Sequence, residues 1–492
     1  MTDPTLLAID QGTTSSRAIL FSKSGDILSV SQKELTLHYP QKGWVEQNPH
    51  DIWNDTLRTC YEVLKNADTV ATLGITNQRE TTILWDRETG EPVYNAIVWQ
   101  DRRTAPLCEK MHTAGHEKTI SAKTGLLLDP YFSATKIAWI LDNVAGVRAR
   151  AEKGDIAFGT IDTWLLWNLT SGKVHATDAT NAGRTMLFNI QTQQWDNELL
   201  QLFNIPHEIL PDVKDNVADY GTTTVFEKPL TIGGMAGDQQ AALIGQACFD
   251  EGMVKSTYGT GCFALMNIGT SFRESKNRLL TTPAYRFNGQ TTYAIEGSIF
   301  IAGAAVQWLR DGLKIINDAE ESEAIATSVP DSNGVYFVPA FTGLGAPYWN
   351  PHARAAISGL TRESTSAHIV RAALEAQAFQ TLDLMEAMRA DTSHAPDVIR
   401  ADGGLVANKF VCQFIADMID IPVEIPKVAE TTALGAAYLA GLQSGVYGGL
   451  DDISKAWEAV HRYDSAMDTA QRTALYDGWK QAIAGILTTA TG

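Results

Sequence analysis

The chain has 492 residues, of which 44% are hydrophobic and 20% are charged, an ordinary composition for a globular protein. Its formal net charge of −18 argues against nucleic acid or an anionic membrane surface as the main partner, because both attract clustered lysine and arginine. The sequence contains no uncharged apolar run of about 18 residues, and its N-terminus lacks the basic and apolar regions of a signal peptide. We therefore expect a cytoplasmic protein.

The cysteines are odd in number and form no CxxC pair or cysteine–histidine cluster. Disulfide frameworks and zinc sites both leave such patterns in a sequence. We expect reduced thiols at Cys60, Cys108, Cys248, Cys262 and Cys412.

The first elements predict a buried sheet flanked by helices. Residues 5–10, 17–21 and 25–30 read as three strands, with a tight turn between the first two. An amphipathic helix is expected to begin near Pro49, and a further strand covers 71–77. This order of elements is typical of an α/β domain.

The second half repeats the opening pattern. Residues 253–269 again read as strand, glycine–threonine turn and strand, so that Gly259-Thr260 corresponds to Gly12-Thr13 about half a chain earlier. Two related domains, 1–248 and 249–492, with a ligand between them would explain this. The alternative is that two unrelated hairpins share a glycine turn by coincidence.

The later elements are expected as strands over 334–341 and 398–402 and as helices over 366–388 and 408–418. Residues 450–492 read as a pair of amphipathic helices without a chemical motif.

The opening hairpin, DQGTTSSR, has the chemistry of a phosphate-binding turn. Glycine permits a turn whose amides converge, and Thr13, Thr14 and Ser15 add hydroxyl donors. Arg17 can neutralise phosphate, whereas Asp10 would repel it unless a cation lay between them. Asp10 therefore predicts Mg²⁺ bound largely through water. The alternative is a structural hairpin with a polar turn.

A nucleotide would have to be held without a P-loop, because the chain contains no GxxxxGK[ST] motif. Two facing glycine–threonine hairpins could hold one. A third glycine-rich segment, ADGGLVANKF at 401–410, brings backbone close to a ligand at a strand-to-helix junction.

These hairpins resemble the phosphate and adenosine elements of the actin–hexokinase–Hsp70 ATPase superfamily. Within it, the chain resembles the FGGY carbohydrate kinases, and among these the members that phosphorylate glycerol. The resemblance covers roughly residues 5 to 445. The motifs that carry it include YFSATKIAWILDN (131–143), AAISGLTRESTSAHIVRAALE (355–375), GWVEQNP (43–49), GITNQRETT (74–82), VWQDRRT (98–104), GTIDTWLLWNLT (159–170), TDATNAGRTMLFNI (177–190) and GDQQAALIGQ (237–246).

The resemblance implies two ribonuclease-H-like, actin-like α/β domains around a nucleotide cleft. It implies ATP and Mg²⁺ as cofactors, and conversion of glycerol to sn-glycerol 3-phosphate as the first step of glycerol catabolism. We also expect a homo-oligomer, either a dimer or a tetramer.

The substrate residues that the resemblance implies suit a small polyol, since glutamate accepts from hydroxyls, arginine donates to their lone pairs and aromatic rings cover the carbon edge. For an isolated Arg-Glu dipeptide an exposed ion pair is the simpler reading, and for a lone aromatic a core position. The implied residues are Arg79, Glu80, Trp99, Tyr131, Asp238, Gln239 and Phe263.

Asp238 matches the family's catalytic base, which accepts the hydroxyl proton as the oxygen attacks phosphorus. Its position after a short apolar strand also fits a helix N-cap. The nucleotide residues implied by the same resemblance are Thr13, Thr14, Ser15, Arg17, Thr260, Gly303, Gln307, Gly404 and Asn408, with Asp10 toward the metal.

The sequence departs from some family members in its regulatory segments. The stretch 223–234 lacks the arginine and glycine run of a loop that binds fructose 1,6-bisphosphate, and no histidine occurs between His207 and His352 where other members are activated by phosphorylation. Two rival functions stay open at this point: a kinase for another polyol or ketose, and an actin-like nucleotide-switched scaffold or chaperone.

Overall fold

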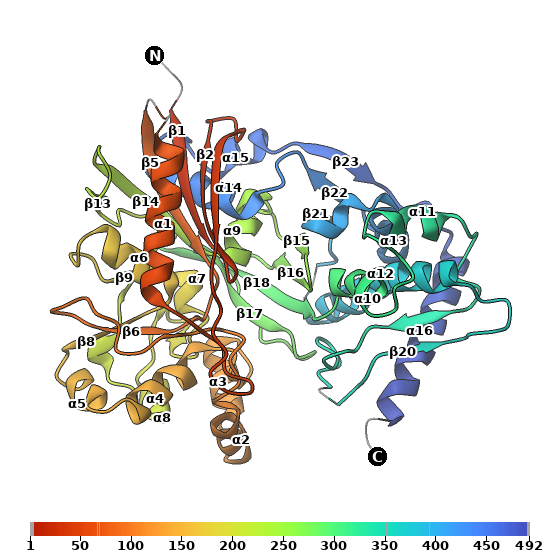
Figure 1. Ribbon diagram of the computed structural model, residues 1–492, viewed down its shortest axis with the longest axis horizontal. Helices are drawn as coiled ribbons and strands as arrows, with labels where there is room; N and C mark the ends of the chain where they lie inside the picture. The colour runs from red at the N-terminus through yellow and green to blue at the C-terminus, as the bar shows by residue number, and fades with distance from the viewer. Residues whose placement is uncertain (1–3, 66, 68, 351, 393, 490–492) are drawn as a thin grey trace.

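The computed structural model describes residues 4–65, 67, 69–350, 352–392 and 394–489. It shows an α/β protein with two domains, each built on a mixed sheet (Figure 1). In these residues, no helix has the length and apolar character needed to span a membrane. All five cysteines are buried and unpaired, as expected for thiols.

The N-terminal sheet places the opening hairpin near its centre. From one edge to the other, its strands are β13 (Thr222–Thr223), β14 (Leu230–Gly237), β5 (Val70–Asn77), β1 (Thr5–Gln11), β2 (Ser15–Phe21) and β3 (Ile27–Glu34). β1 runs antiparallel to β2 and parallel to β5, which is itself parallel to β14. β1 and β5 are covered on both faces and are buried along most of their length, so neither alternates between buried and exposed residues.

The two faces of this sheet pack against helices from opposite ends of the chain. α1 (Pro49–Leu64) and α6 (Ile161–Leu169) cover the face that carries Leu7 and Ile9. The face that carries Leu6 and Ala8 packs against α14 (Thr431–Gln443) and α9 (Asp238–Gly245). α14 therefore lies among the N-terminal strands although it comes late in the sequence (Figure 1).

The C-terminal sheet repeats the strand order of the first. Its strands are β17 (Leu280–Phe287), β18 (Gln290–Ile299), β16 (Cys262–Asn267), β15 (Met253–Tyr258), β21 (Val398–Asp402), β22 (Val423–Pro426) and β23 (Ala459–Tyr463). β15 is antiparallel to β16 and parallel to β21, just as β1 is to β2 and β5. The repeat predicted from the two glycine–threonine hairpins is thus confirmed at the level of topology.

Helices complete the core around the second sheet. They are α10 (Gly303–Asp311), α11 (Glu321–Thr327), α12 (Ser366–Asp391), α13 (Lys409–Ile419) and α16 (Thr469–Thr489). α15 (Leu450–Ala456) precedes β23, and the short pair β19 (Tyr336–Val338) and β20 (Ala356–Ser358) lies beside α12.

A separate helical layer with its own apolar core extends the N-terminal domain (Figure 1). Its helices are α2 (Ala105–Thr113), α3 (Glu117–Thr124), α4 (Ser133–Asn143), α5 (Val147–Ala151), α8 (Asn197–Phe203) and the 3₁₀ turn η1 (His207–Ile209). The short helix α7 (Ala179–Ala182) lies outside this layer, beside β14 and β17. The short strand pairs of the N-terminal half are β4 (Glu46–Gln47) with β7 (Ala96–Ile97), β6 (Ile83–Asp86) with β8 (Ile156–Gly159), β9 (Ala176–Asp178) with β12 (Asp212–Lys214), and β10 (Phe188–Asn189) with β11 (Gln194–Trp195).

The helices α9 and α14 cross so closely that their contact requires glycine on both sides. A Cβ atom at Gly435 would lie 1.8 Å from the carbonyl oxygen of Ala241, and one at Gly245 would lie 1.9 Å from that of Thr431. Real Cβ atoms do not approach backbone oxygen this closely, so the two glycines set the distance between the helices. The pair packs on both sheets and joins the domains.

Two predicted segments differ from the structure. The strand expected over 334–341 is only the three residues of β19, because the chain leaves the pair with β20 after Val338. The tail does contain two helices, but β23 lies between them and pairs with β22 at the edge of the sheet.

Candidate active site

The opening hairpin is fixed by its backbone and leaves hydroxyls free at its tip. The Gly12 amide donates to the Ser15 carbonyl at 2.9 Å, which closes the turn. Thr13 is held by a residue outside the hairpin, because the Trp99 indole N–H donates to its hydroxyl oxygen at 2.9 Å. Among the described residues, the Thr14 and Ser15 hydroxyls have no hydrogen-bond partner. The turn can therefore offer both hydroxyls to a ligand.

Arg17 and Asp10 face each other across the same hairpin and form an ion pair of 2.6 Å. Arg17 also contacts Glu430 at 2.7 Å, just before α14. Burial raises the pKa of the Asp10 carboxyl, and the charges of Glu430 and Asp238 add to this rise although Arg17 opposes it. A cation would relieve this concentration of negative charge. No group of three histidine, cysteine, aspartate or glutamate side chains among the described residues could hold a metal directly, so Asp10 fits Mg²⁺ only as a carboxylate that binds the ion through water.

The dipeptide Arg79-Glu80 is not an exposed ion pair, since the two residues are only 3% and 1% exposed. They follow β5, and Glu80 has a positive φ of 62°. Each is paired elsewhere: Arg79 Nη1 lies 2.6 Å from Glu296, and Glu80 Oε1 accepts from Arg184 Nε at 2.6 Å. The distance between Arg79 Nε and Glu80 Oε1 is 3.9 Å. A buried pair held by outside partners is an arrangement suited to binding a polar ligand.

The aromatic residues expected at the substrate come from both domains. The Trp99 and Tyr131 rings meet edge to face, with centroids 5.4 Å apart. Phe263 lies on β16 of the C-terminal sheet and is partly exposed. In the described part of the chain, no ring contact joins Phe263 to the other two rings. Trp99 and Tyr131 thus pack together in the N-terminal domain, whereas Phe263 belongs to the C-terminal domain.

Asp238 is the first residue of α9, at the end of β14. Its Oδ1 accepts the Gln239 amide at 2.7 Å and lies 3.3 Å from Arg79 Nε. Its side chain is 31% exposed, unlike the buried carboxylates around it. Gly237, not Asp238, is the N-cap, so the capping explanation does not account for this carboxylate. It is accessible to a ligand and next to the Arg79-Glu80 pair.

Gln239, beside Asp238, is held by a lysine that the sequence reasoning did not identify. Lys255 Nζ donates to Gln239 Oε1 and, at 3.4 Å, to the carbonyl of Phe263. Burial lowers the pKa of the Lys255 ammonium, against the charges of Asp402 and Asp238. This lysine therefore joins β15 to the first turn of α9.

The glycine-rich segments of the C-terminal domain pack against one another. The Gly303 amide donates to the Gly259 carbonyl at 2.9 Å, and the Ala302 amide donates to the Thr260 carbonyl at 2.9 Å. Gly403 has a φ of 95°, and a Cβ there would lie 2.4 Å from the Tyr258 carbonyl oxygen. The second hairpin, the start of α10 and the end of β21 thus meet at one place.

The other nucleotide candidates surround this meeting point. Gly404 begins the 3₁₀ turn η2 (Gly404–Ala407), and no atom would lie within 4 Å of a Cβ placed there. Gln307 is exposed on α10, four residues after Gly303. Asn408 caps α13 by accepting from the Val411 amide at 3.1 Å, and its amide group donates to Ser322 at 3.2 Å. Asn408 thus already has a structural role.

Three further charged residues around the candidate site were not identified from the sequence. Glu296 is the one charged residue in the mostly buried strand β18, and its side chain is 2% exposed. A charge in the middle of such a strand was a usable signal. Arg184, fully buried, lies within a family motif without an assigned role, and Glu430 precedes a helix with no pattern of its own.

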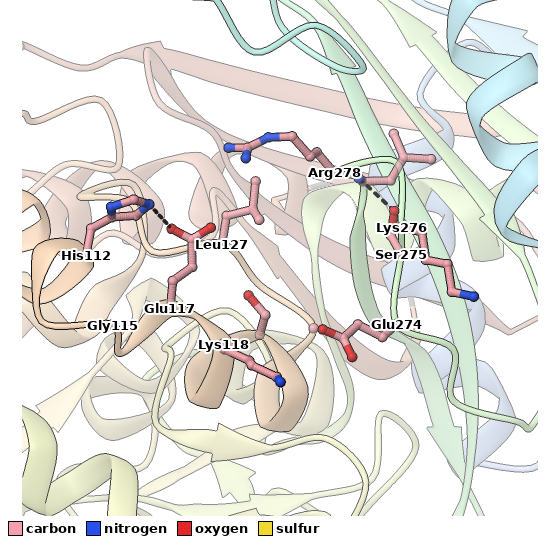
Figure 2. Close-up of a pocket in the computed structure, with 12 residues that line it drawn as sticks. His112, Gly115, Glu117, Lys118, Leu127, Glu274, Ser275, Lys276 and Arg278 are labelled. Carbon is pink, nitrogen blue, oxygen red and sulfur yellow. Dashed lines mark hydrogen bonds and ion pairs between the residues drawn. The ribbon is translucent and has the colours of Figure 1, made fainter.

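A cavity of about 440 Å³ lies elsewhere, between α2 and α3 of the N-terminal domain and the β16–β17 loop (Figure 2). Its lining carries Glu117 and Lys118 on one side and Glu274 and Arg278 on the other. None of the candidate active-site residues contributes to it.

Comparisons with known proteins agree with this architecture. Residues 5–245 match the N-terminal domain of the FGGY family of carbohydrate kinases, and residues 254–444 match the C-terminal domain of that family. A glycerol kinase of Nitrosomonas eutropha is 63% identical over 490 residues, covering 98% of each chain. One of Alcanivorax borkumensis is 57% identical over 495 residues, covering 99% of each.

Solved structures show the same fold. The crystal structure of Plasmodium falciparum glycerol kinase with ADP gives a TM-score of 0.95 at 38% identity, covering 99% of this chain and 98% of that one. A ligand-bound xylulose kinase from Lactobacillus acidophilus gives 0.90 at 22% identity, a likeness of fold alone. The chain belongs to the FGGY family of carbohydrate kinases.

Proposed function

We propose that the protein transfers the γ-phosphoryl group of ATP to the terminal hydroxyl of glycerol and so forms sn-glycerol 3-phosphate, the first step of glycerol catabolism. The observation that carries this proposal is the 63% identity to a glycerol kinase over 98% of both chains. The candidate polyol residues also support it, since Arg79 lies next to both Glu80 and Asp238.

Glycerol would lie against the Arg79-Glu80 pair. The Oε2 atom of Glu80 accepts no hydrogen bond from the described residues and is free for a substrate hydroxyl. Burial raises the pKa of the Tyr131 phenol, which keeps it a hydrogen-bond donor. Trp99 and Phe263 would enclose the carbon edge, and Gln239 would add a hydrogen bond.

Asp238 would act as the general base. A carboxylate that is partly exposed, while its neighbours are buried in ion pairs, can reach a substrate hydroxyl and accept its proton as the oxygen attacks phosphorus in line. Arg79 fixes one carboxylate oxygen at 3.3 Å and thereby orients the group.

ATP would lie between the two hairpins. Thr13, through its backbone, Thr14, Ser15 and Arg17 would contact its phosphates from one side and Thr260 from the other. The adenosine end would lie along Gly303, Gln307, Gly404 and Asn408. Asp10 would hold Mg²⁺ through water, and this ion supplies charge neutralisation on the polyphosphate.

A phosphorylation assay over several polyols tests this function. The purified protein is incubated with Mg²⁺, γ-labelled ATP and, separately, glycerol, xylulose, gluconate or erythritol. A labelled three-carbon ester formed at a kcat/KM at least tenfold above that of the other polyols supports the proposal. ATP hydrolysis that ignores glycerol would instead indicate a nucleotide-switched scaffold.

Two further properties stay predictions from the sequence. We propose that the protein is cytoplasmic and forms a dimer or tetramer, and sedimentation of the purified chain tests the second point.

A further inference from the structure

Four buried charges form a ring behind the proposed glycerol pocket. Glu296 contacts Arg79 Nη1 at 2.6 Å and Arg184 Nη2 at 3.0 Å. Arg184 Nε then donates to Glu80 Oε1 at 2.6 Å, and the 3.9 Å separation between Glu80 and Arg79 closes the ring. Each of the four side chains is 2% exposed or less.

The ring is electrically neutral, because two arginines balance two glutamates. An unpaired charge at this depth would be strongly unfavourable, so removal of one member would leave the others uncompensated. The carboxylates nevertheless differ: burial would raise the pKa of Glu296, but Arg184 and Arg79 outweigh it and lower that pKa to about 2. For Glu80, burial dominates and raises the pKa. Glu296 is thus the firmly ionised member that holds both arginines.

The contacts leave only one side of Arg79 and Glu80 available to a ligand. Both Nη atoms of Arg79 donate to Glu296, and Nη1 also donates to Gln240 at 3.2 Å, while Nε points toward Asp238. Arg184 takes Oε1 of Glu80, and the main-chain carbonyl of Glu80 accepts from Ser133 Oγ at 3.0 Å. Oε2 of Glu80 stays without a donor in the described structure. Arg184 and Glu296 therefore determine which atoms of Arg79 and Glu80 stay available to a ligand.

Arg184 has a further feature that a purely structural ion pair would not need. Its Nη1 is buried and has no hydrogen-bond partner in the described residues. The guanidinium carbon lies 5.7 Å from the centroid of the Tyr131 ring and 5.2 Å from that of Phe132. Arg184 thus contacts two members of the proposed substrate site, Glu80 through a hydrogen bond and Tyr131 through its ring.

The members of the ring come from distant segments and both domains. Arg79 and Glu80 follow β5, and Arg184 follows α7. Glu296 belongs to β18, which pairs with β16 and β17 of the C-terminal sheet. Glu296 is consequently the one member of the ring that connects the Arg79-Glu80 pair to the C-terminal domain.

We propose that Arg184 and Glu296 are positioning residues for the polyol: Arg184 orients Glu80, and Glu296 orients Arg79 from the C-terminal domain. This inference rests on the proposed function, since it concerns how the same pocket recognises substrate hydroxyls. Neither residue needs to touch glycerol to act in this way.

Steady-state kinetics of Arg184→Gln and Glu296→Gln test the inference. Each change removes a charge-assisted contact, so we expect the KM for glycerol to rise about 10- to 100-fold. The KM for ATP should change less than about threefold, because the nucleotide candidates lie outside the ring. Arg184→Lys should recover part of the loss, since an ammonium group can contact one glutamate but lacks the fork that reaches both.

Arg286→Gln is the matched control. Arg286 is also a buried arginine at the boundary between the domains, where it pairs with Asp215 at 2.5 Å and donates to the Val213 carbonyl. It belongs to no part of the proposed pocket. This variant should lower the thermal midpoint while leaving the KM for glycerol within about twofold.

Ligand-induced thermal shifts separate misfolding from loss of positioning. A correctly folded Arg184→Gln protein should keep the shift caused by Mg·ADP and lose that caused by glycerol. If both shifts disappear, Glu296→Asp, which keeps the charge but shortens the side chain, should keep the Mg·ADP shift and weaken the glycerol shift.

The outcomes distinguish the inference from the function on which it rests. A wild-type protein that does not phosphorylate glycerol refutes the proposed function and this inference together. If the wild-type protein is active and Arg184→Gln and Glu296→Gln keep the KM for glycerol within twofold while only their thermal midpoints fall, the ring is structural and the inference alone is wrong.

Discussion

Replacement of Asp238 by asparagine separates the chemistry of this carboxylate from its contribution to folding. Its side chain is 31% exposed and contacts the Gln239 amide and Arg79 Nε. Asparagine keeps the oxygen that accepts from Gln239, and Arg79 keeps its 2.6 Å contact with Glu296. The folding cost should thus be at most about 1 kcal/mol, the range of a partly exposed ion pair.

The expected loss of turnover is much larger. A positioned general base contributes about 10²- to 10⁴-fold, which corresponds to about 3–5 kcal/mol in the activation barrier. We therefore expect Asp238→Asn to keep its thermal midpoint within a few degrees and its glycerol-induced shift, and to lose turnover by at least 100-fold.

The assay is the initial rate of labelled glycerol phosphate formation at saturating glycerol and Mg·ATP. Asp451→Asn is a suitable control because Asp451 also lies in the first turn of a helix, α15, but outside the candidate site. A turnover of Asp238→Asn within threefold of wild type would remove Asp238 from the role of base.

Three other perturbations follow from the geometry. Gly435→Ala should lower stability by at least about 2–3 kcal/mol through overpacking, whereas Gly485→Ala, in open space on α16, should be neutral or stabilising by calorimetry. Arg17→Ala should raise the KM for ATP about 10- to 100-fold with little change for glycerol, and an unchanged KM for ATP would exclude Arg17 from the phosphate site. The pKa of Glu296 is about 2 instead of the usual 4.5, so its ionised form stabilises the fold above pH 4.5 and this stabilisation is lost as the pH falls toward 2. Between pH 5 and 3 the wild type should lose about 2 kcal/mol that Glu296→Gln does not lose, and parallel stability profiles of the two proteins would contradict this.

The parts of the fold that could be predicted from the sequence are those encoded by neighbouring residues. A glycine–threonine turn between apolar runs specifies a hairpin locally, and both hairpins are present in the structure. The long helix expected with Ser366 as its cap is present, but it begins one residue earlier than that cap implies, because Thr365 is the N-cap and forms a capping box with His368. Turns and caps of this kind can be predicted because the residues that form them are neighbours in the sequence.

The candidate site was only half predictable, for a different physical reason. Arg79 and Glu80 stood out through a family motif, but their neighbouring positions suggested that they pair with each other. In the structure their direct contact is long, at 3.9 Å, and their short ion pairs are with Glu296 and Arg184. Those partners are more than 100 positions away in the sequence, and only the packing of β18 and α7 brings them near. A pattern read along the chain cannot supply such pairings.

The edge strand β23 illustrates a third case. Its burial pattern is mostly exposed, so it lacks the apolar alternation that identifies a strand. It is held by backbone hydrogen bonds to β22 and by the Arg462–Glu424 ion pair at 2.8 Å. Backbone pairing at a sheet edge places few constraints on the side chains, so the sequence predicts this segment only as part of a helical tail.

The crossing of α9 and α14 gives the active-site geometry a mechanical basis. α9 begins with Asp238, and α14 begins directly after Glu430, which forms an ion pair with Arg17 of the opening hairpin. The two helices meet at Gly245 and Gly435 with no room for a Cβ atom, so neither can slide along the other without a backbone clash. A displacement of α14 that moved the opening hairpin would therefore also displace α9 and its carboxylate. The close glycine contact thus keeps the proposed base in register with the opening hairpin, where we propose that the transferred phosphate is bound.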